Sequence, residues 1–579
     1  MAAASGSSYD AIVVGAGHNG LICANYLARG GKKVLVLEGR VVLGGACTTE
    51  ELIPGARWSS CAFIAGLLRP EIIADLELKR YGLELYQGDA LGFVLFRDGS
   101  HFMMWKELDR TLRELERYSK RDAQRFLDFG LRLQRFAEIF RPFLLAPPPQ
   151  RSEVLAAFEA AGEPELFDEF VLLPTRDLLD RYFESGHLKG FLNFFGMVSI
   201  WGGPSTPGTS YVYGHHAIGE FDGTFGQFGF ARGGMGSISQ ALASSAEAHG
   251  VEIKLATPVA RVIVEDGAAV GVATDSGEEY RAGVVVSNAD PQRSLLGLLG
   301  PGDLDEELRT AVEGIDMRGS MARIHLLIDE LPQYLPFDSP NLGPQHHGHQ
   351  MLGASVENFE KAWEAQRRGV FPDEWVIEAV IQSATDPTLA EPGKHTLTLG
   401  VQQLPYELAG TDWDAEKDRW ADSVMEDLFA FAPNLRDHVV ERYVITPKDI
   451  ERDYGITRGN IFHGAMGLDQ LFSSRPLAAI GSYATPVHGY YLCGAGTHPG
   501  GGVIGANGHN AAKVILGTAV AAPPPARRVR SGGLIGRAMA TKAGRKAGYA
   551  LARQPALRPL AKRAARTGSG AGGDTRGDG

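Results

Sequence analysis

The first forty residues predict a strand, a helix and a second strand. Tyr9–Val14 is an apolar run typical of a buried strand, and it leads into the glycine-rich turn Gly15–Gly20, after which apolar residues recur at helical spacing. A second apolar strand, Lys33–Leu37, ends on Glu38. This βαβ unit indicates a parallel sheet with a right-handed crossover.

Apolar positions recur at helical spacing again between Glu107 and Phe140. They predict two amphipathic helices, because Ser119 and Asp122 have the spacing of a capping box between them. A mostly helical stretch continues to about Tyr182. This region therefore differs in character from the βαβ unit.

From Val251 the apolar period becomes two, and Asp-Gly and Ser-Gly pairs separate the runs. Such dipeptides favour tight hairpin turns, so we expect a β-meander as far as Ser287. A mixed region of strands and helices follows. The strand Tyr490–Cys493 then leads through a second glycine-rich loop into a helix that we expect to end near Ala521.

The composition is that of a globular protein. Of the 579 residues, 44% are apolar and 22% are charged, which excludes global disorder, a fibre and a coiled coil. The four cysteines show no CxxC or metal-ligand spacing, so we expect neither a disulfide framework nor a zinc site. We expect no secretory signal at the N-terminus. The longest membrane-like stretch, Gly190–Pro204, is too short to cross a bilayer.

The net charge of −12 is divided unevenly along the chain. Residues 521–579 hold 13 Lys or Arg and 2 Asp, which leaves 44 basic and 67 acidic residues in the rest, so the body carries −23 and the tail +11. An acidic body argues against nucleic acid as a partner. The tail is either a solvated, disordered extension or a basic surface for peripheral contact with an anionic membrane.

The turn Gly15–Gly20 reads GxGxxG and has the context of a dinucleotide-binding motif. The first glycine permits the tight turn, the second lets the backbone approach a pyrophosphate at the helix N-terminus, and the third allows close helix packing. Glu38, at the end of the next strand, is placed to accept hydrogen bonds from a ribose.

The next residues favour FAD over a nicotinamide cofactor. Glu38, Arg40 and the run Gly44-Gly45-Ala46 form ExRxxxGGA, which resembles the extension of two-dinucleotide-binding-domain flavoproteins. Paired glycines let the chain pass beside an extended dinucleotide, and Arg40 can neutralise phosphate charge. No second dinucleotide motif follows, so we expect no separate NAD(P)H domain.

The second glycine cluster, Gly494–Gly505, opens a helix but no acidic strand end follows that helix. We therefore interpret it as a helix N-terminus aimed at a ligand, whose free amides could stabilise the negative edge of a reduced flavin. His498 lies in this loop, and His463 lies in GNIFHG. Both are candidate catalytic residues, because histidine exchanges protons near neutral pH, and each has a structural hydrogen-bonding role as its alternative.

The run YYLCGAGTHPGGGVIG is similar to the C-terminal signature of bacterial phytoene desaturases. With GNIFHG it also resembles a narrower branch that includes an animal mitochondrial protein named after a pyridine nucleotide-disulphide oxidoreductase domain. The resemblance covers Tyr9 to about Val520. It implies an FAD fold with an interleaved substrate domain and a role for the Val259 backbone at the adenine. No neighbouring cysteines support a redox dithiol.

The fold class expected is thus α/β, with a Rossmann-like FAD-binding domain and an interleaved α+β substrate domain. The FAD-binding domain is expected to comprise three segments, 9–70, 226–300 with the β-meander, and 481–520. The substrate domain is expected to comprise a mainly helical substrate or cap region at 71–225 and a second segment at 301–480. A flexible N-terminus, 1–8, and the basic tail, 521–579, are expected at the two ends.

The expected function is that of an FAD-dependent dehydrogenase or desaturase, which transfers a hydride from an apolar, isoprenoid or lipid-like substrate to flavin N5. Oxygen or a quinone is the expected electron acceptor. We expect a cytoplasmic location, either free or peripheral at the inner face of a membrane, or a mitochondrial one in a eukaryote. The alternatives are a flavin amine oxidase and a non-catalytic prenyl- or lipid-binding protein on the same scaffold.

Two histidine clusters, His215-His216 and His346-His347-His349, lack accompanying acids or cysteines at ligand spacing, so no metal site is expected. The residues expected to bind FAD come from both glycine loops and the segments beside them: Gly15, Gly17, Asn19, Gly20, Glu38, Arg40, Gly44, Gly45, Ala46, Val259, Gly494, Ala495, Gly502, Val503 and Ile504.

Overall fold

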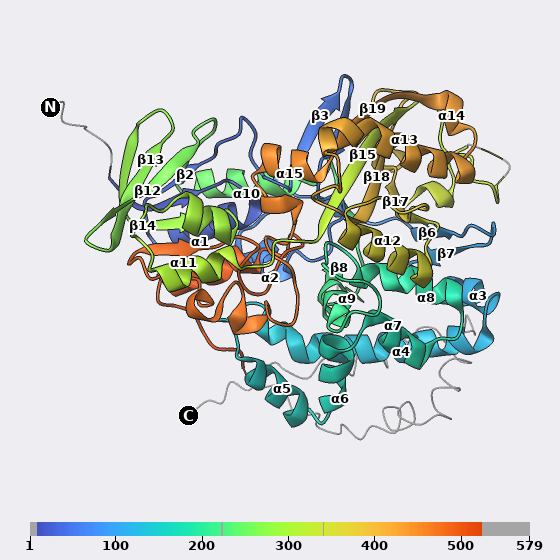
Figure 1. Ribbon diagram of the computed structural model, residues 1–579, viewed down its shortest axis with the longest axis horizontal. Helices are drawn as coiled ribbons and strands as arrows, with labels where there is room; N and C mark the ends of the chain where they lie inside the picture. The colour runs from blue at the N-terminus through green and yellow to red at the C-terminus, as the bar shows by residue number, and fades with distance from the viewer. Residues whose placement is uncertain (1–7, 222–223, 338, 340, 524–579) are drawn as a thin grey trace, which may run out of the picture.

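The computed structural model describes residues 8–221, 224–337, 339 and 341–523. Two seven-stranded sheets lie side by side, and a group of helices lies next to both of them (Figure 1). The basic segment from residue 524 onward, to which the membrane-contact prediction applies, lies outside the described residues. No described helix combines the length and apolar character needed to span a membrane.

The first sheet is built around the predicted βαβ unit. Five strands run parallel, and a two-stranded antiparallel extension forms the predicted meander. The parallel strands, in spatial order, are β11 (Glu252–Lys254), β2 (Val34–Leu37), β1 (Tyr9–Val14), β14 (Glu279–Ser287) and β20 (Tyr490–Leu492). The extension consists of β13 (Ala268–Thr274) and β12 (Val259–Glu265).

Helices cover both faces of the first sheet, which explains why β2 is apolar and buried at every position. On one face Val13 and Val36 pack with α1 (His18–Arg29), α10 (Gly236–Ala248) and α16 (Ala506–Ile515). On the other face Ile12 and Leu35 pack with α11 (Glu306–Glu313). Alternate residues of β1 and β2 therefore enter two separate cores.

The second sheet is mostly antiparallel and draws its strands from distant regions of the chain. Its apolar face packs on α13 (Trp413–Phe431), with Ile324 and Leu399 against Trp420. The strands, in spatial order, are β19 (Val439–Ile445), β15 (Ser320–Ile328), β18 (His395–Leu404), β17 (Ile377–Val380), β16 (His349–Leu352), β6 (Ala90–Leu95) and β7 (His101–Trp105).

The helical group packs around the largest core, which is rich in phenylalanine. Ser119 caps the second helix by accepting a hydrogen bond from the Asp122 backbone N–H at 3.0 Å, as predicted. The helices are α3 (Leu108–Glu116), α4 (Lys120–Phe140), α5 (Arg151–Ala160), α6 (Pro164–Phe167), α7 (Thr175–Tyr182), α8 (Gly186–Asn193) and α9 (Thr209–Ala217).

The structure differs from the sequence prediction in three places. Residues 85–105, expected in a mainly helical region, form strands, because β6 and β7 pair with each other and β6 with the distant β16. Helix α11 falls in a range expected in the substrate domain but packs on the first sheet. Helix α16 ends at Ile515 and does not continue to Ala521 as expected. Gly517, two residues after this end, takes a left-handed φ of 67°.

The remaining helices connect these units. Helix α2 (Pro70–Asp75) follows the first hairpin, and α15 (Pro447–Tyr454) precedes the GNIFHG segment. Helices α12 (Val356–Arg368) and α14 (Leu435–His438) lie in the chain between strands of the second sheet. The hairpin itself is β3 (Thr49–Ile53) with β4 (Ala56–Ser59).

Candidate functional site

The first glycine loop lies at the carboxyl end of β1 and is tightly packed. Gly15 has a φ of 96°, a conformation that favours glycine. A Cβ on Gly20 would collide with the carbonyl oxygen of Gly15, and one on Gly17 would lie 2.5 Å from the Asn288 amide nitrogen. The third glycine therefore allows the helix to lie against the loop, as the motif requires.

Glu38 joins this loop to the end of β2. Its side chain is only 8% exposed. One carboxylate oxygen accepts the Ala16 N–H at 2.7 Å and the other accepts the Arg40 N–H at 2.9 Å. Because each carboxylate oxygen can accept a second hydrogen bond, Glu38 keeps the capacity to bind ribose hydroxyls.

The GGA segment runs directly beside the first loop. The Gly44 N–H donates to the Ala16 carbonyl at 2.9 Å, and Gly17 and Gly44 pair as in a parallel bridge. The Ala46 carbonyl in turn accepts the Ala62 N–H at 3.0 Å. The paired glycines thus let a third backbone segment approach the dinucleotide loop.

Arg40 is held in place by an acid and an aromatic ring. Its Nη2 donates to Glu50 Oε1 at 2.6 Å, and its guanidinium lies 4.5 Å from the ring centre of Tyr454. The remaining Nη1 is buried and has no partner. The side chain therefore has one free donor for a ligand.

Val259 lies close to Glu38, although they are far apart in sequence. The Thr257 N–H donates to the Glu38 carbonyl and the Ala256 N–H to the Arg40 carbonyl, both at 2.8 Å. Val259 begins β12 two residues later. The residue that the family resemblance assigns to the adenine therefore lies beside the predicted ribose-binding acid.

The second glycine loop connects β20 to α16 and adjoins the first. Helices α1 and α16 cross so closely that a Cβ on Gly508 would collide with the Asn19 carbonyl. Val503 has a φ of 59°, which is rare for a β-branched residue and marks a strained loop. The Ile504 carbonyl accepts the Arg69 N–H at 3.2 Å. Gly494, Ala495 and Gly502 also lie in this loop.

The two candidate catalytic histidines have different surroundings. His498 is fully buried, and its Nε2 donates to the Phe143 carbonyl at 2.8 Å, which ties the second loop to the helical group. His463 has a φ of 59°, and its buried Nδ1 has no partner. Burial lowers the pKa of the His463 imidazole, so it is neutral and able to accept a proton. Both catalytic assignments stay predictions.

Because His498 is buried, we expect the folded protein to lose stability in acid. Burial lowers its pKa to about 4, while the unfolded side chain has the ordinary value of 6.5. Between pH 6.5 and 4 the unfolded chain binds a proton that the folded chain does not, so stability is complete above pH 6.5 and falls as the pH drops. We expect His498 to contribute a loss of about 3 kcal/mol over this range.

The variant His498→Gln keeps a donor for the Phe143 carbonyl but removes the titration. Melting temperatures measured from pH 7 to pH 4 should fall less steeply for this variant than for the natural protein. Equal slopes for the two proteins would show that His498 contributes nothing to acid sensitivity.

Buried polar atoms without partners gather on the segments that border the two glycine loops. They include His18 Nε2, Asn19 Oδ1, Arg40 Nη1, His463 Nδ1, His498 Nδ1 and Asn507 Oδ1. An unpaired buried polar atom costs free energy unless a ligand pairs with it. Together with the helix N-termini, these atoms fit a polar ligand with phosphate, hydroxyl and ring-nitrogen groups such as a dinucleotide.

A third glycine-rich segment, residues 232–236, lies at this site and was not predicted from the sequence. The Gly236 N–H donates to Thr49 Oγ1 and the Met235 N–H to Ser59 Oγ, both at 2.9 Å, so this segment packs against the residues that follow GGA. Three glycines in five residues just before a helical run were the available signal. Asn288, whose side chain lies beside Gly17, is also part of this site, but no sequence motif around it indicated this.

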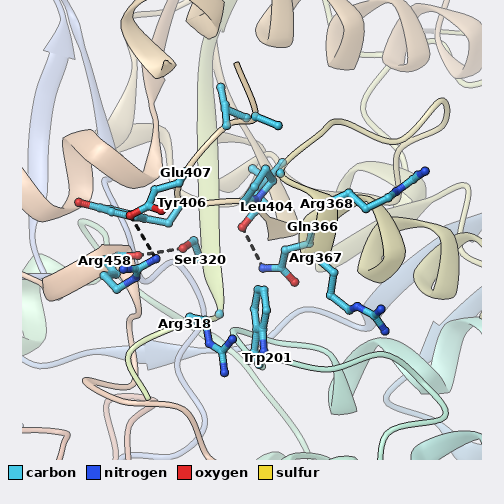
Figure 2. A pocket seen from close by; sticks show the side chains of 15 residues that line it. Trp201, Arg318, Ser320, Gln366, Arg367, Arg368, Leu404, Tyr406, Glu407 and Arg458 are labelled. Atoms are coloured by element: carbon cyan, nitrogen blue, oxygen red, sulfur yellow. Dashed lines mark hydrogen bonds and ion pairs between the residues drawn. The ribbon is translucent and has the colours of Figure 1, made fainter. Parts of the chain in front are cut away.

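A surface pocket with a volume of about 330 Å³ lies beside the start of β15 and the end of β18, and Figure 2 shows its lining residues. Arg458 and Glu407 form an ion pair at 3.5 Å on one side of it, and Arg367 and Arg368 extend away from the other side. Trp201 lies at its base in this view. None of its lining residues belongs to either glycine loop, so this pocket is separate from the dinucleotide site.

Within the described residues, no three His, Cys, Asp or Glu side chains gather as a metal site would require. His215 Nε2 instead pairs with the Gly501 carbonyl at 2.9 Å, and His346 Nε2 with the Pro332 carbonyl at 2.8 Å. These histidines therefore hold loops in place.

Comparison with known sequences agrees with this geometry. Residues 20–516 match the family described as "Flavin containing amine oxidoreductase". The chain is 37% identical over 542 residues to the mouse Pyridine nucleotide-disulfide oxidoreductase domain-containing protein 2, covering 88% of this chain and 93% of that protein. It is 28% identical to a limonene dehydrogenase chain of Castellaniella defragrans, covering 87% and 94%. It is 24% identical to a Paracoccus phytoene desaturase (lycopene-forming), covering 88% and 97%.

Solved structures show the same fold. An oxidoreductase from Methanosarcina mazei superimposes with a TM-score of 0.56 at 17% identity, covering 88% of this chain and 99% of that one. Cyclohexylamine oxidase from Brevibacterium oxydans superimposes with a TM-score of 0.54 at 16% identity, with the same coverage. The predicted fold class is thereby confirmed.

Proposed function

The chain belongs to the family of flavin-containing amine oxidoreductases, and from this membership we propose that it is an FAD-dependent dehydrogenase that oxidises an apolar, isoprenoid or lipid-like molecule. The resemblance to phytoene desaturases is confirmed by the relatives. The cofactor is FAD, in agreement with the family and with the solved oxidases.

The residues around the glycine loops suit FAD. We assign Glu38 to the ribose, the N-terminus of α1 to the pyrophosphate, and the backbone at Val259 to the adenine. We assign the second loop, with Val503 and the N-terminus of α16, to the rest of the cofactor. When bound, FAD supplies the acceptor for two electrons. The unpartnered atoms described above are the donors and acceptors that the chain offers.

One observation carries the choice of an apolar substrate over an amine. Every buried carboxylate of the described chain already accepts hydrogen bonds from protein groups; they are Glu38, Asp122, Glu169, Asp290, Glu378, Asp386 and Asp449. A substrate ammonium group would have to share an acid that already binds protein donors, whereas an apolar substrate needs no such partner. Two relatives, moreover, are named for limonene and for phytoene.

Aromatic side chains cluster where the helical group meets the second sheet, as Phe194 contacts His349 of β16. The rings of Phe195 and Phe228 stack at 6.0 Å, and Phe194 and Phe195 contact edge to face at 5.6 Å. These residues link the helical group to the segment before α10. An apolar molecule bound among them would be shielded from water.

His463 is the residue that we expect to take the proton released by the substrate. The Nδ1 atoms of His463 and His498 are both free, but the ring of His498 is also tied through its Nε2 to the Phe143 carbonyl, whereas no such bond holds the ring of His463 among the described residues. The positive φ of His463 holds it in a conformation that asparagine tolerates and alanine does not. His463→Asn therefore removes the base without straining the loop.

The test is anaerobic mixing of FAD-loaded protein with cyclic and acyclic isoprenoids and, separately, with primary amines, followed by the visible absorbance of the flavin. We expect the isoprenoids to bleach the flavin absorbance and the primary amines to leave it unchanged. His463→Asn should slow this bleaching by about 100-fold or more while the flavin content and melting temperature stay unchanged. His498→Gln is measured alongside it, and an equal slowing in that variant with none in His463→Asn would assign the proton transfer to His498. Bleaching by amines alone would overturn the proposal in favour of an amine oxidase.

A further inference from the structure

The face of the second sheet that lies away from α13 is buried and carries a charged pair among polar and apolar side chains. Arg323 on β15 and Glu378 on β17 both lie opposite Gly400 on the intervening β18. Arg323 Nη1 donates to Glu378 Oε2 at 2.7 Å, and both residues are only 4% exposed. A Cβ on Gly400 would collide with this guanidinium, so the missing side chain lets the ion pair lie flat on the sheet.

This charged face is covered by segments that also form the candidate site. Arg323 Nε donates to the Cys61 carbonyl at 3.3 Å, and its guanidinium lies 4.1 Å from the ring centre of Phe63. The neighbouring Ala62 is hydrogen-bonded to Ala46 of the GGA segment. On the other side, the ring of Phe194 from the helical group lies 5.4 Å from His349.

Two polar groups on this face have unused hydrogen-bonding capacity. Arg323 Nη2 bonds to none of the described residues and keeps some accessible surface, although the side chain as a whole is buried. The buried Nε2 of His349, on the adjacent β16, has no partner among them either. Burial lowers the pKa of His349, an effect that the charge of Glu378 opposes and that of Arg323 reinforces. Unpaired groups in such a place indicate a ligand.

The local charge indicates the kind of ligand. Arg323 and Glu378 cancel each other, and His349 is neutral. A carboxylate ligand would lie beside Glu378, and an ammonium ion would lie beside Arg323, so both are disfavoured. A neutral oxygen can accept a hydrogen bond from Arg323 Nη2 without adding any charge.

We propose that the substrate carries a neutral oxygen function, a carbonyl or hydroxyl group, on its apolar body, and that Arg323 and His349 bind this oxygen. The proposal rests on the proposed function and refines its substrate class. It makes Arg323 and His349 determinants of specificity, because a pure hydrocarbon leaves both groups unpaired.

The test uses FAD-loaded protein and four ligands with one carbon skeleton: p-menthane, menthone, menthylamine and p-menthane carboxylate. Dissociation constants are measured from changes in the flavin absorption spectrum and checked by shifts in melting temperature. We expect menthone to bind about tenfold more tightly than p-menthane, the effect of one hydrogen bond to a charged donor. The amine and the carboxylate should bind more weakly than the ketone.

Two variants examine the residues. Arg323→Lys keeps the charge beside Glu378 but lacks Nη2, and His349→Phe removes the imidazole; in both, menthone should lose its advantage over p-menthane. The control is Arg442→Lys, on the neighbouring β19, where the arginine pairs with Asp418 and Asp422. This variant should still bind menthone more tightly than p-menthane.

The outcomes separate this inference from the proposed function. Reduction of the flavin by isoprenoids with no advantage for menthone, or an advantage that survives in both variants, would overturn the inference alone. Tightest binding by menthylamine, together with flavin reduction by amines only, would overturn both.

Discussion

Glu38→Ala is expected to weaken the binding of FAD by about 10- to 100-fold. The carboxylate is the only charged group of the ExRxxxGGA motif that contacts the first glycine loop itself, through the Ala16 N–H. Its loss removes charged hydrogen bonds to the ribose, worth about 1.5 to 3 kcal/mol. It also leaves the Ala16 and Arg40 N–H groups without their acceptor, so the loop loses its preformed shape.

The measurement is the retention of FAD after reconstitution, followed by titration of the apoprotein with FAD. Purified natural protein should be yellow. Glu38→Gln keeps one carbonyl oxygen and should lie between the natural protein and Glu38→Ala. Arg40→Ala should be milder than either, because only its Nη1 is free. Unchanged affinity in a folded Glu38→Ala protein would show that the ribose is held elsewhere.

The elements that are local in sequence could be predicted from it. Strand β1 has the predicted bounds, and β2 begins one residue later than expected, at Val34. The glycine spacing, the turn and the apolar runs all lie within about thirty residues of one another. Local patterns of this kind determine a βαβ unit without help from the rest of the chain.

The second sheet could not be predicted, because its pairings join distant segments. Strand β6 near residue 92 pairs with β16 near residue 350, and nothing in either segment identifies the other. Strand β6 is a short apolar run without polar alternation, and it lies in a region that becomes helical further along. Long-range pairings of this kind depend on the assembled cores.

Sequence could predict only those parts of the candidate site that a local motif encodes. Both glycine loops were visible, whereas the Arg323–Glu378 pair was not, because its members are 55 residues apart. Gly400 within a strand was a weak signal of close approach, but the sequence could not say what approaches it. The charged face of the second sheet is thus a finding of the structure.

Gly400→Ala is expected to destabilise the folded protein by about 3 to 5 kcal/mol, the range for breaking a buried ion pair. The added methyl group would lie where the Arg323 guanidinium and the Glu378 carboxylate meet, and β18 cannot move away because β15 and β17 flank it. The pair would have to separate inside the protein, which leaves two buried charges without partners. Melting temperatures and urea midpoints of the FAD-loaded proteins measure the effect.

Two further variants test the cause. Gly130→Ala, on the exposed side of α4 where nothing lies within 4 Å of the added atom, should stabilise the protein by about 0.5 to 1 kcal/mol. Adding Arg323→Met and Glu378→Leu to Gly400→Ala should recover most of the lost stability, because apolar residues replace a buried ion pair at little cost. If the triple variant is no more stable than Gly400→Ala, the clash is with the backbone of the sheet and the ion pair is not its cause.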